Sequence, residues 1–220
     1  MEVRDFLDYT LVPSGLLILG AYHAWLLHRI VHHSSTTVIG LNAINRRFWV
    51  RAMMQDSKNG ILAVQTLRNN IMASTVLAST AIMLSSVIAV LMSNAGGGNS
   101  AGRFFGILVC FLGGFLLTVQ SIRYYSHAGM LINVPVDQRC QSHRLSVEYV
   151  ERTLNKASYF WSMGLRAFYF SFPLFLWIFG PIPMFISCPV LVLLLYFLDF
   201  TFEKGQAEEE EEEKEEEEKQ

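Results

Sequence analysis

Residues Asn59 to Asn94 read NGILAVQTLRNNIMASTVLASTAIMLSSVIAVLMSN. This stretch begins with polar side chains, carries its last charge at Arg68, and then continues to Asn94 without an ionisable group. An uncharged helix of about 18 residues or more is long enough to cross a bilayer. The stretch therefore predicts a helix that enters a membrane, preceded by a polar segment, Asn59 to Asn70, that stays outside it.

The composition of the whole chain agrees with this interpretation. Hydrophobic residues make up 52% of the 220 residues and charged residues only 16%, whereas ordinary globular proteins have roughly 25% charged residues. The apolar residues also lie in long blocks, which indicates spans rather than amphipathic helices around a water-exposed core. We therefore expect an all-α, multi-pass transmembrane helix bundle.

Five spans account for the apolar blocks. They lie at about residues 11–31, 71–92, 104–122, 159–179 and 182–202. The block from Tyr159 to Phe202 would be roughly 66 Å long as one helix, about twice the ~30 Å hydrocarbon thickness, so we divide it in two. We predict the turn at Gly180-Pro181-Ile182-Pro183, because a glycine followed by prolines stops a helix. The count falls to four if this block is a single broken helix.

The orientation follows from the Lys and Arg residues of the connecting segments. Segments 32–70 and 123–158 carry five each, and such segments stay in the cytosol. A five-span chain then has its N-terminus on the non-cytosolic side and its acidic tail, 203–220, in the cytosol, whereas four spans would put the tail on the other side. The tail contains two runs of glutamates, ten in all, at 208–213 and 215–218, in addition to Glu203, and we expect it to be disordered.

The two basic segments have a chemistry suited to anionic lipid headgroups. Within the first, residues Leu41 to Met54 place apolar side chains at near-helical spacing beside Arg47 and Arg51, which predicts a short basic helix lying on the headgroups. We therefore expect the partner to be the lipid bilayer, with its anionic headgroups at the basic segments, and we expect no nucleic-acid partner.

Small residues recur at helical spacing on two of the predicted spans. They are Ser74, Ala78, Ala81, Ser85 and Ala89 on one, and Gly102, Gly106 and Gly114 on the next. Such residues let two helix backbones approach closely in lipid, although Ala and Ser are also tolerated in any apolar helix. We predict that the Ala/Ser face packs against the glycine face in a tight antiparallel pair. Faces of this kind also support a homo-oligomer.

Three parts of the sequence resemble a known family. They are the run NGILAVQTLRNNIMASTVLASTAI, the basic segment before it with Arg47, Trp49, Arg51 and Met53, and the later WIFGPIPMF. The chain resembles plant members of a membrane protein family catalogued as domain of unknown function 599, which also has bacterial relatives. The resemblance covers most of residues 5–202 and excludes the acidic tail. It implies an integral membrane protein, with no settled activity and no catalytic residues to carry over.

A polar group lies where the stretch that begins at Asn59 meets the membrane. It consists of Gln65, Arg68, Asn69 and Asn70. These residues are candidates for the mouth of a polar cavity or for a lipid-phosphate site. The alternative is the ordinary polar flank of a membrane helix.

Ionisable residues inside the spans are the other candidates. His28 and His32 share a helix face and His23 lies deeper, so the three suggest a proton or metal site, yet zinc needs three or four ligands and no carboxylate is nearby in sequence. Polar interfacial residues at a helix end are the simpler interpretation. Arg166 and Asp199 should lie at the same membrane face, where an ion pair would lower the cost of holding either near lipid.

We find no catalytic motif in the sequence: it lacks a phosphate-binding glycine loop, a GxSxG elbow and HExxH. We therefore expect a non-enzymatic integral membrane protein that acts through packing, interaction or lipid association, with no cofactor and no metal. A small transporter or channel subunit is the alternative, and a membrane enzyme that uses the first-span histidines is a weaker one.

Overall fold

The computed structural model describes residues 3–33, 36–94, 99–134 and 143–200. The predicted acidic tail and most of the glycine-rich connector after Asn94 lie outside the described residues. The helices are α1 (Val3–His32), α2 (Val38–Gln55), η2 (Ser57–Asn59), α3 (Gly60–Asn94), α4 (Asn99–Leu131), α5 (His143–Leu176) and α6 (Pro181–Asp199). No strand occurs within those ranges, and the prediction of an all-α helix bundle is confirmed.

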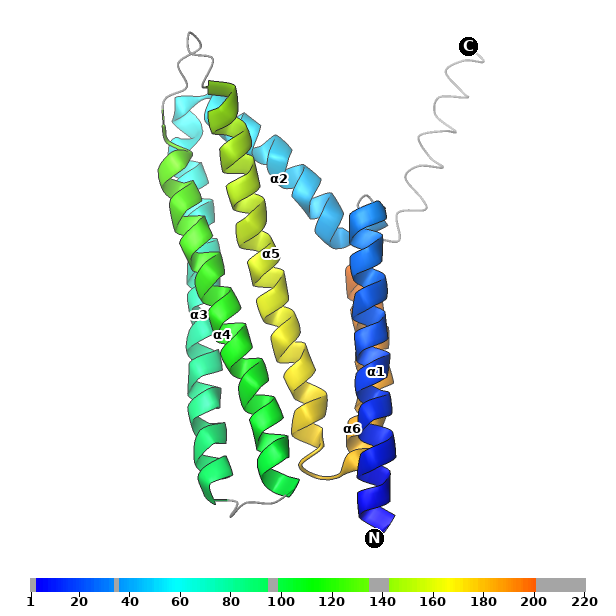
Figure 1. The fold of residues 1–220 in the computed structure, drawn as a ribbon. Coiled ribbons are helices and arrows are strands. Elements are labelled where there is room, and N and C mark those ends of the chain that lie inside the picture. Colours follow the sequence, from blue (N-terminus) through cyan, green and yellow to red (C-terminus); the bar gives the residue numbers. More distant parts are fainter. Residues whose placement is uncertain (1–2, 34–35, 95–98, 135–142, 201–220) are drawn as a thin grey trace, which may run out of the picture.

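The long helices stand side by side (Figure 1). Helices α3, α4 and α5 form one group, in which α4 packs closely against both neighbours, and α1 and α6 form a second group. Each long helix runs opposite to the one before it in the chain, so the start of α1 and the end of α6 lie at opposite ends of the bundle. Helix α2 slopes across one end, called the upper end below, between the two groups (Figure 1).

Four helical segments are long and apolar enough to cross a membrane: Phe6–His32, Gly60–Asn94, Ala101–Leu131 and Pro181–Asp199. The chain is therefore a multi-pass membrane protein. The second half of α5, which the sequence predicts as a further span, lies beside these segments (Figure 1) but is less apolar because it carries Arg166 and several Tyr and Trp side chains. Helix α5 contacts α2, α4 and α6, so much of its surface faces protein.

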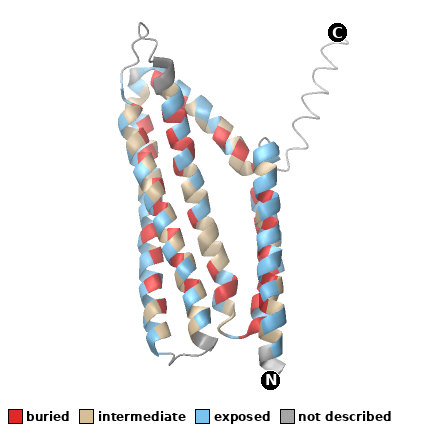
Figure 2. Ribbon diagram, in the orientation of Figure 1, coloured by how far each residue is buried: buried red, intermediate tan, exposed pale blue. Residues whose placement is uncertain are grey.

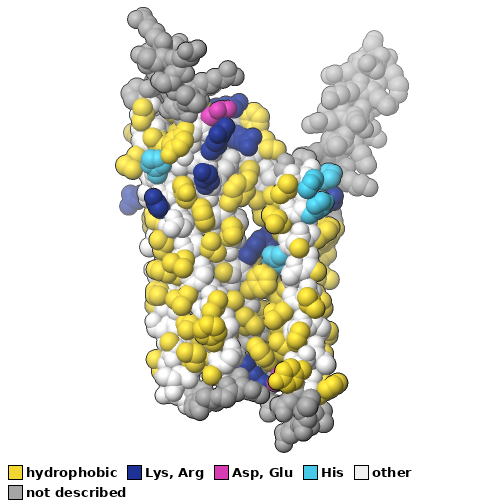
Figure 3. Space-filling view, in the orientation of Figure 1, with side chains coloured by type: hydrophobic (Ala, Val, Ile, Leu, Met, Phe, Trp, Pro, Cys, Tyr) yellow, Lys and Arg dark blue, Asp and Glu magenta, His cyan; other side chains and the backbone are white. Residues whose placement is uncertain are grey.

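Apolar side chains cover the outside of the bundle as well as its interior. Leu19, Ile107 and Met184 are fully buried between helices, whereas Val76 and Leu193 are more than half exposed. Exposed residues alternate with buried ones along every long helix (Figure 2), and the exposed ones are largely hydrophobic (Figure 3). An apolar outer surface of this extent suits lipid, because lipid tails replace water around it.

The small residues of α3 face α4. Ser74, Ala78, Ala81 and Ser85 are buried, Ala89 is half-buried, and α3 packs almost entirely against α4. The predicted partner helix is therefore correct, but the predicted contact with the glycine face is wrong, because Gly106 and Gly114 of α4 face α5. A Cβ atom on Gly106 would meet Leu174 of α5, one on Gly114 would meet Phe168 and Ala167, and one on Gly102 would meet nothing within 4 Å.

Helices α4 and α5 approach each other closely at Gly164. A Cβ atom placed on Gly164 of α5 would lie 2.7 Å from Cγ2 of Thr118 and 3.6 Å from the backbone oxygen of Gly114. Two helices can come this close only where one of them lacks a side chain. Gly164, which the sequence analysis did not single out, therefore explains why α4 turns its glycine face to α5 and leaves another face for α3.

The predicted turn between α5 and α6 is present. Helix α5 ends at Leu176, and Gly180 has a φ angle of 152°, a conformation that residues with a Cβ rarely adopt. Pro181 then begins α6 at a position where a proline needs no backbone hydrogen bond. The last apolar block is thus a hairpin of two helices and not one broken helix.

Candidate functional site

Charged residues mark two levels along the bundle. On α4, Arg103 and Arg123 are 20 residues apart, which corresponds to about 30 Å at ~1.5 Å per residue. On α1, Asp8 and Arg29 are 21 residues apart, or about 32 Å. Because a hydrocarbon core is ~30 Å thick, we call the level of Asp8 and Arg103 the lower level and that of Arg29 and Arg123 the upper level.

A cluster at the lower level joins α1 to α4 and to the turn after α5. Arg103 Nη2 donates to Asp8 Oδ2 over 2.6 Å, and Trp177 Nε1 donates to Asp8 Oδ1 over 3.0 Å. The guanidinium of Arg103 also lies over the Trp177 ring, 5.4 Å from its centroid, and donates to the Trp177 carbonyl oxygen over 3.3 Å. The sequence analysis missed this lower cluster. The only sign of it in the sequence was that Asp8 and Arg103 each lie just before an apolar block.

A second cluster, between the two levels, joins α1, α5 and α6. Arg166 Nη2 donates to Asp199 Oδ1 over 2.6 Å, so these residues form the ion pair that their positions suggested. The hydroxyl of Tyr22 donates to the other carboxylate oxygen of Asp199 over 2.6 Å. The Arg166 and Asp199 side chains are only 15% and 9% exposed. We call Tyr22, His23, Arg166 and Asp199 the inner cluster.

The geometry defines the tautomer of His23. Its Nδ1 lies 2.8 Å from the backbone oxygen of Leu19, and its Nε2 lies 3.4 Å from Nη1 of Arg166. A guanidinium has only donors, so Nε2 must accept and Nδ1–H donates to Leu19. His23 is then neutral and the inner cluster has no net charge, which lowers the cost of holding it among apolar side chains.

The other two candidate histidines lie elsewhere. His28 and His32 are exposed, with ring centroids 4.2 Å apart, and His32 Nδ1 lies 3.0 Å from the backbone oxygen of His28. In the part of the chain that the structure describes, no three His, Cys, Asp or Glu residues come together in a way that could hold a metal ion. His23, His28 and His32 therefore do not converge with a carboxylate, which the enzyme hypothesis requires.

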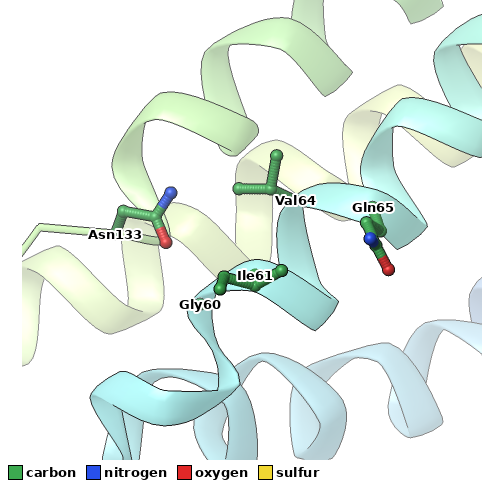
Figure 4. Close-up of a pocket in the computed structure, with 5 residues that line it drawn as sticks. All are labelled: Gly60, Ile61, Val64, Gln65 and Asn133. Carbon is green, nitrogen blue, oxygen red and sulfur yellow. The ribbon is translucent and has the colours of Figure 1, made fainter.

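The polar group around Arg68 is not gathered into one cavity. Gln65 lines an open depression of about 410 Å³ together with Gly60, Ile61, Val64 and Asn133. Asn133 faces the first turn of α3, while the amide of Gln65 points away from it (Figure 4). Arg68 and Asn69 are exposed, and Asn70 is half-buried on another face, where its carbonyl oxygen accepts a hydrogen bond from Ser74.

Helix α2, which the sequence predicts to lie on the headgroups, is docked against α5 by polar residues. Arg46 Nε donates to Asn155 Oδ1 over 2.9 Å, and Arg51 Nε donates to Glu151 Oε1 over 2.6 Å. Burial lowers the pKa of Arg46, whereas the hydrogen bond to Glu151 raises the pKa of Arg51. Glu151 and Asn155 are four residues apart on one face of α5. This spacing is visible in the sequence and could have indicated a polar face that receives α2.

Exposed cations gather towards the upper end of the bundle (Figure 3). Apart from Arg51, which pairs with Glu151, the exposed cations of the described residues there are Arg47, Lys58, Arg68, Arg123, Arg152 and Lys156. We call these six the upper basic surface. Arg152 lies 3.7 Å from Glu148 in an exposed pair, an arrangement that contributes little binding energy. The surface therefore keeps most of its positive charge available to an outside partner.

The comparison with protein families agrees with this architecture. A family model described as "Protein of unknown function, DUF599" matches residues 10–204. The chain belongs to the DUF599 family. The match covers the described helices of this DUF599 member from Thr10 of α1 to the end of α6, and it confirms the resemblance to this family. No curated protein and no solved structure matches the chain.

Proposed function

We propose that this DUF599 protein is a non-enzymatic, lipid-associated membrane component whose upper basic surface binds anionic headgroups on the cytosolic side. The observation that carries the proposal is the distribution of charge along the bundle. Six exposed cations gather at the upper end, whereas Arg103 at the lower level is paired with Asp8. Each cation close to an anionic leaflet contributes about 1 kcal/mol, so the charge pattern favours one leaflet strongly.

Lipid selectivity tests this function directly. The purified protein is reconstituted into phosphatidylcholine bilayers, and electron spin resonance measures the fraction of spin-labelled phosphatidylserine, against spin-labelled phosphatidylcholine, that the protein immobilises. We expect a preference for phosphatidylserine that weakens between 0.1 and 1 M salt, because the screening length falls from about 10 to about 3 Å. Equal immobilisation of the two lipids at low salt would refute the proposal.

Matched variants identify the surface. The triple variant Arg47→Gln, Arg68→Gln, Arg123→Gln removes three exposed charges and should abolish most of the preference. Glu148→Gln removes an exposed negative charge from the same end and should leave the preference intact or raise it. A triple variant with the selectivity of the wild type would show that this surface is not the binding surface.

The cytosolic placement of the upper end has its own test. Lys58→Cys introduces a thiol at an exposed position of the upper end, in a background with its native cysteines changed to serine. In intact cells, a membrane-impermeant maleimide should modify this thiol only after the membrane is permeabilised. Modification in intact cells would place the basic surface outside and contradict the positive-inside rule for this chain.

A small transporter is the second candidate, and the inner cluster favours it. Ionisable residues between the two membrane levels mark proton or solute pathways in many transporters. Arg166 of α5 meets Asp199 of α6 and His23 of α1 there, at the junction of the two helix groups. Proton flux into liposomes, followed with a trapped pH-sensitive dye, should then exceed that of protein-free liposomes and fall with Asp199→Asn. Equal flux in all three preparations would remove this candidate.

A further inference from the structure

Arg29 lies on a platform of aromatic rings near the end of α1. Its guanidinium carbon is 5.8 Å from the ring centroid of Trp25 and 5.8 Å from that of Phe200. Trp25, Tyr196 and Phe200 pack together beneath it, with centroid distances of 6.3 Å, 5.4 Å and 5.0 Å. Such contacts hold a cation by attraction to the ring faces and fix the plane of the guanidinium.

Arg29 differs from Arg46, Arg103 and Arg166, the other part-buried arginines of the described ranges, because each of those three has a side-chain hydrogen-bond partner. Arg103 pairs with Asp8 and Arg166 pairs with Asp199. The side chain of Arg29 makes no hydrogen bond and no ion pair with any residue in the described ranges, and its Nε is buried without a partner. An arginine held in place with its donors unused is suited to an acceptor from outside the chain.

The position of Arg29 indicates what that acceptor is. It lies at the upper level, about 32 Å along α1 from Asp8, where the hydrocarbon ends and the lipid phosphates begin. Trp and Tyr side chains concentrate at this depth, as Trp25 and Tyr196 do here. Phosphate oxygens fit the two-pronged donor geometry of a guanidinium.

We propose that Arg29, held on Trp25 and Phe200, binds the phosphate group of a lipid headgroup at the junction of α1 and α6. The site deepens the proposed lipid association and rests on it. It is separate from the upper basic surface, which consists of residues of α2, η2, α3, α4 and α5. One lipid phosphate occupies the site, whereas the basic surface attracts the anionic leaflet as a whole.

Calorimetry on the full chain in uncharged detergent tests the site. The titrants are dioctanoyl phosphatidate, dioctanoyl phosphatidylcholine and inorganic phosphate. We expect phosphatidate to bind with a stoichiometry near one. Affinity should fall about tenfold or more in Arg29→Gln, because a charge-assisted hydrogen bond is lost. Arg29→Lys should weaken binding less, and Trp25→Leu should weaken binding with the charge unchanged.

His32→Gln is the matched control, because it changes an exposed polar side chain at the same end of α1 that is not part of the upper basic surface. Unchanged phosphatidate affinity in this variant, together with the loss in Arg29→Gln, supports the site. Equal losses in the two variants, or wild-type affinity in Arg29→Gln, would overturn it. Inorganic phosphate that binds as tightly as phosphatidate would assign the site to a soluble phosphate and overturn the lipid assignment.

The two proposals can fail separately. Loss of serine-lipid selectivity in the triple variant with phosphatidate affinity retained would support both the basic surface and a separate Arg29 site. Selectivity that is absent in the wild type, with Arg29-dependent phosphatidate binding still present, would refute the proposed function but leave the discrete site. Absence of phosphatidate binding in the wild type would refute the site whatever the selectivity.

Discussion

Replacing Gly164 with alanine places a methyl group where α4 and α5 approach each other closely. The new Cβ would lie 2.7 Å from Cγ2 of Thr118, whereas carbon atoms prefer a separation of about 3.5–4.0 Å. The Thr118 side chain has little freedom to move away, because it is buried and its hydroxyl donates to the Gly114 carbonyl oxygen over 2.8 Å. The helices must therefore separate by about 1 Å along their contact.

The magnitude follows from comparison with a glycine that faces open space. Overpacking of this kind costs about 1–3 kcal/mol, and alanine recovers about 0.5–1 kcal/mol through its preference for helix. Gly113→Ala on α4 has the same helix preference but meets nothing within 4 Å. The preference cancels between the two variants, so Gly164→Ala should be less stable than Gly113→Ala by about 1–3 kcal/mol.

The assay is equilibrium unfolding in mixed detergent micelles, which gives a free energy of unfolding for each variant. Thr118→Ser removes Cγ2 and keeps the hydroxyl, so it provides a sign test. It should destabilise the wild type by leaving a small cavity, but it should stabilise the Gly164→Ala variant by removing the clash. A Gly164→Ala protein as stable as Gly113→Ala, or a Thr118→Ser change with the same sign in both backgrounds, would refute this account of the contact.

Three further changes concern the polar clusters. Asp199→Asn leaves the part-buried Arg166 without its charge partner and should lower the free energy of unfolding by about 3–5 kcal/mol. Glu148→Gln breaks an exposed pair and should lower it by less than about 1 kcal/mol. Similar losses of stability in both variants would contradict the view that burial makes the first pair important. Tyr22→Phe removes one hydrogen bond to a charged group and should cost about 1.5–3 kcal/mol in the same unfolding assay, with no added effect in the Asp199→Asn background if the hydroxyl acts only through that carboxylate. Asp8→Asn weakens the lower cluster and should alter the tryptophan emission spectrum, and an unchanged spectrum would mean that the indole hydrogen bond is not present in solution.

Local patterns were enough to predict the long helices and the turn. Uncharged apolar blocks and the Gly180-Pro181 sequence depend on residues close together in the chain, and the helices and the hairpin follow them. The Arg166–Asp199 pair could be predicted for the same reason. Two helices joined by a short turn place these residues, which are 33 positions apart, at a common depth.

The remaining contacts depend on which helix faces meet, and single-sequence patterns carry little information about that. Gly106 and Gly114 of α4 were assigned to α3, the preceding helix in the sequence, but they face α5. Asp8 and Arg103 are 95 positions apart, and nothing in either segment identifies the other. His28 and His32 do share a face, as their spacing requires, but spacing alone cannot supply a third ligand.

The pairing of α1 with α6 has a consequence for biosynthesis. The first long helix packs mainly against the last one, and the partners of Tyr22 and His23 are Asp199 and Arg166. A ribosome therefore delivers α1 to the bilayer long before its neighbour exists. Until Pro181–Asp199 has been inserted, the Tyr22 and His23 side chains of α1 face lipid, water or a chaperone. Completion of this bundle therefore depends on insertion of α6, and a chain that stops before α6 leaves its first helix without its main packing partner.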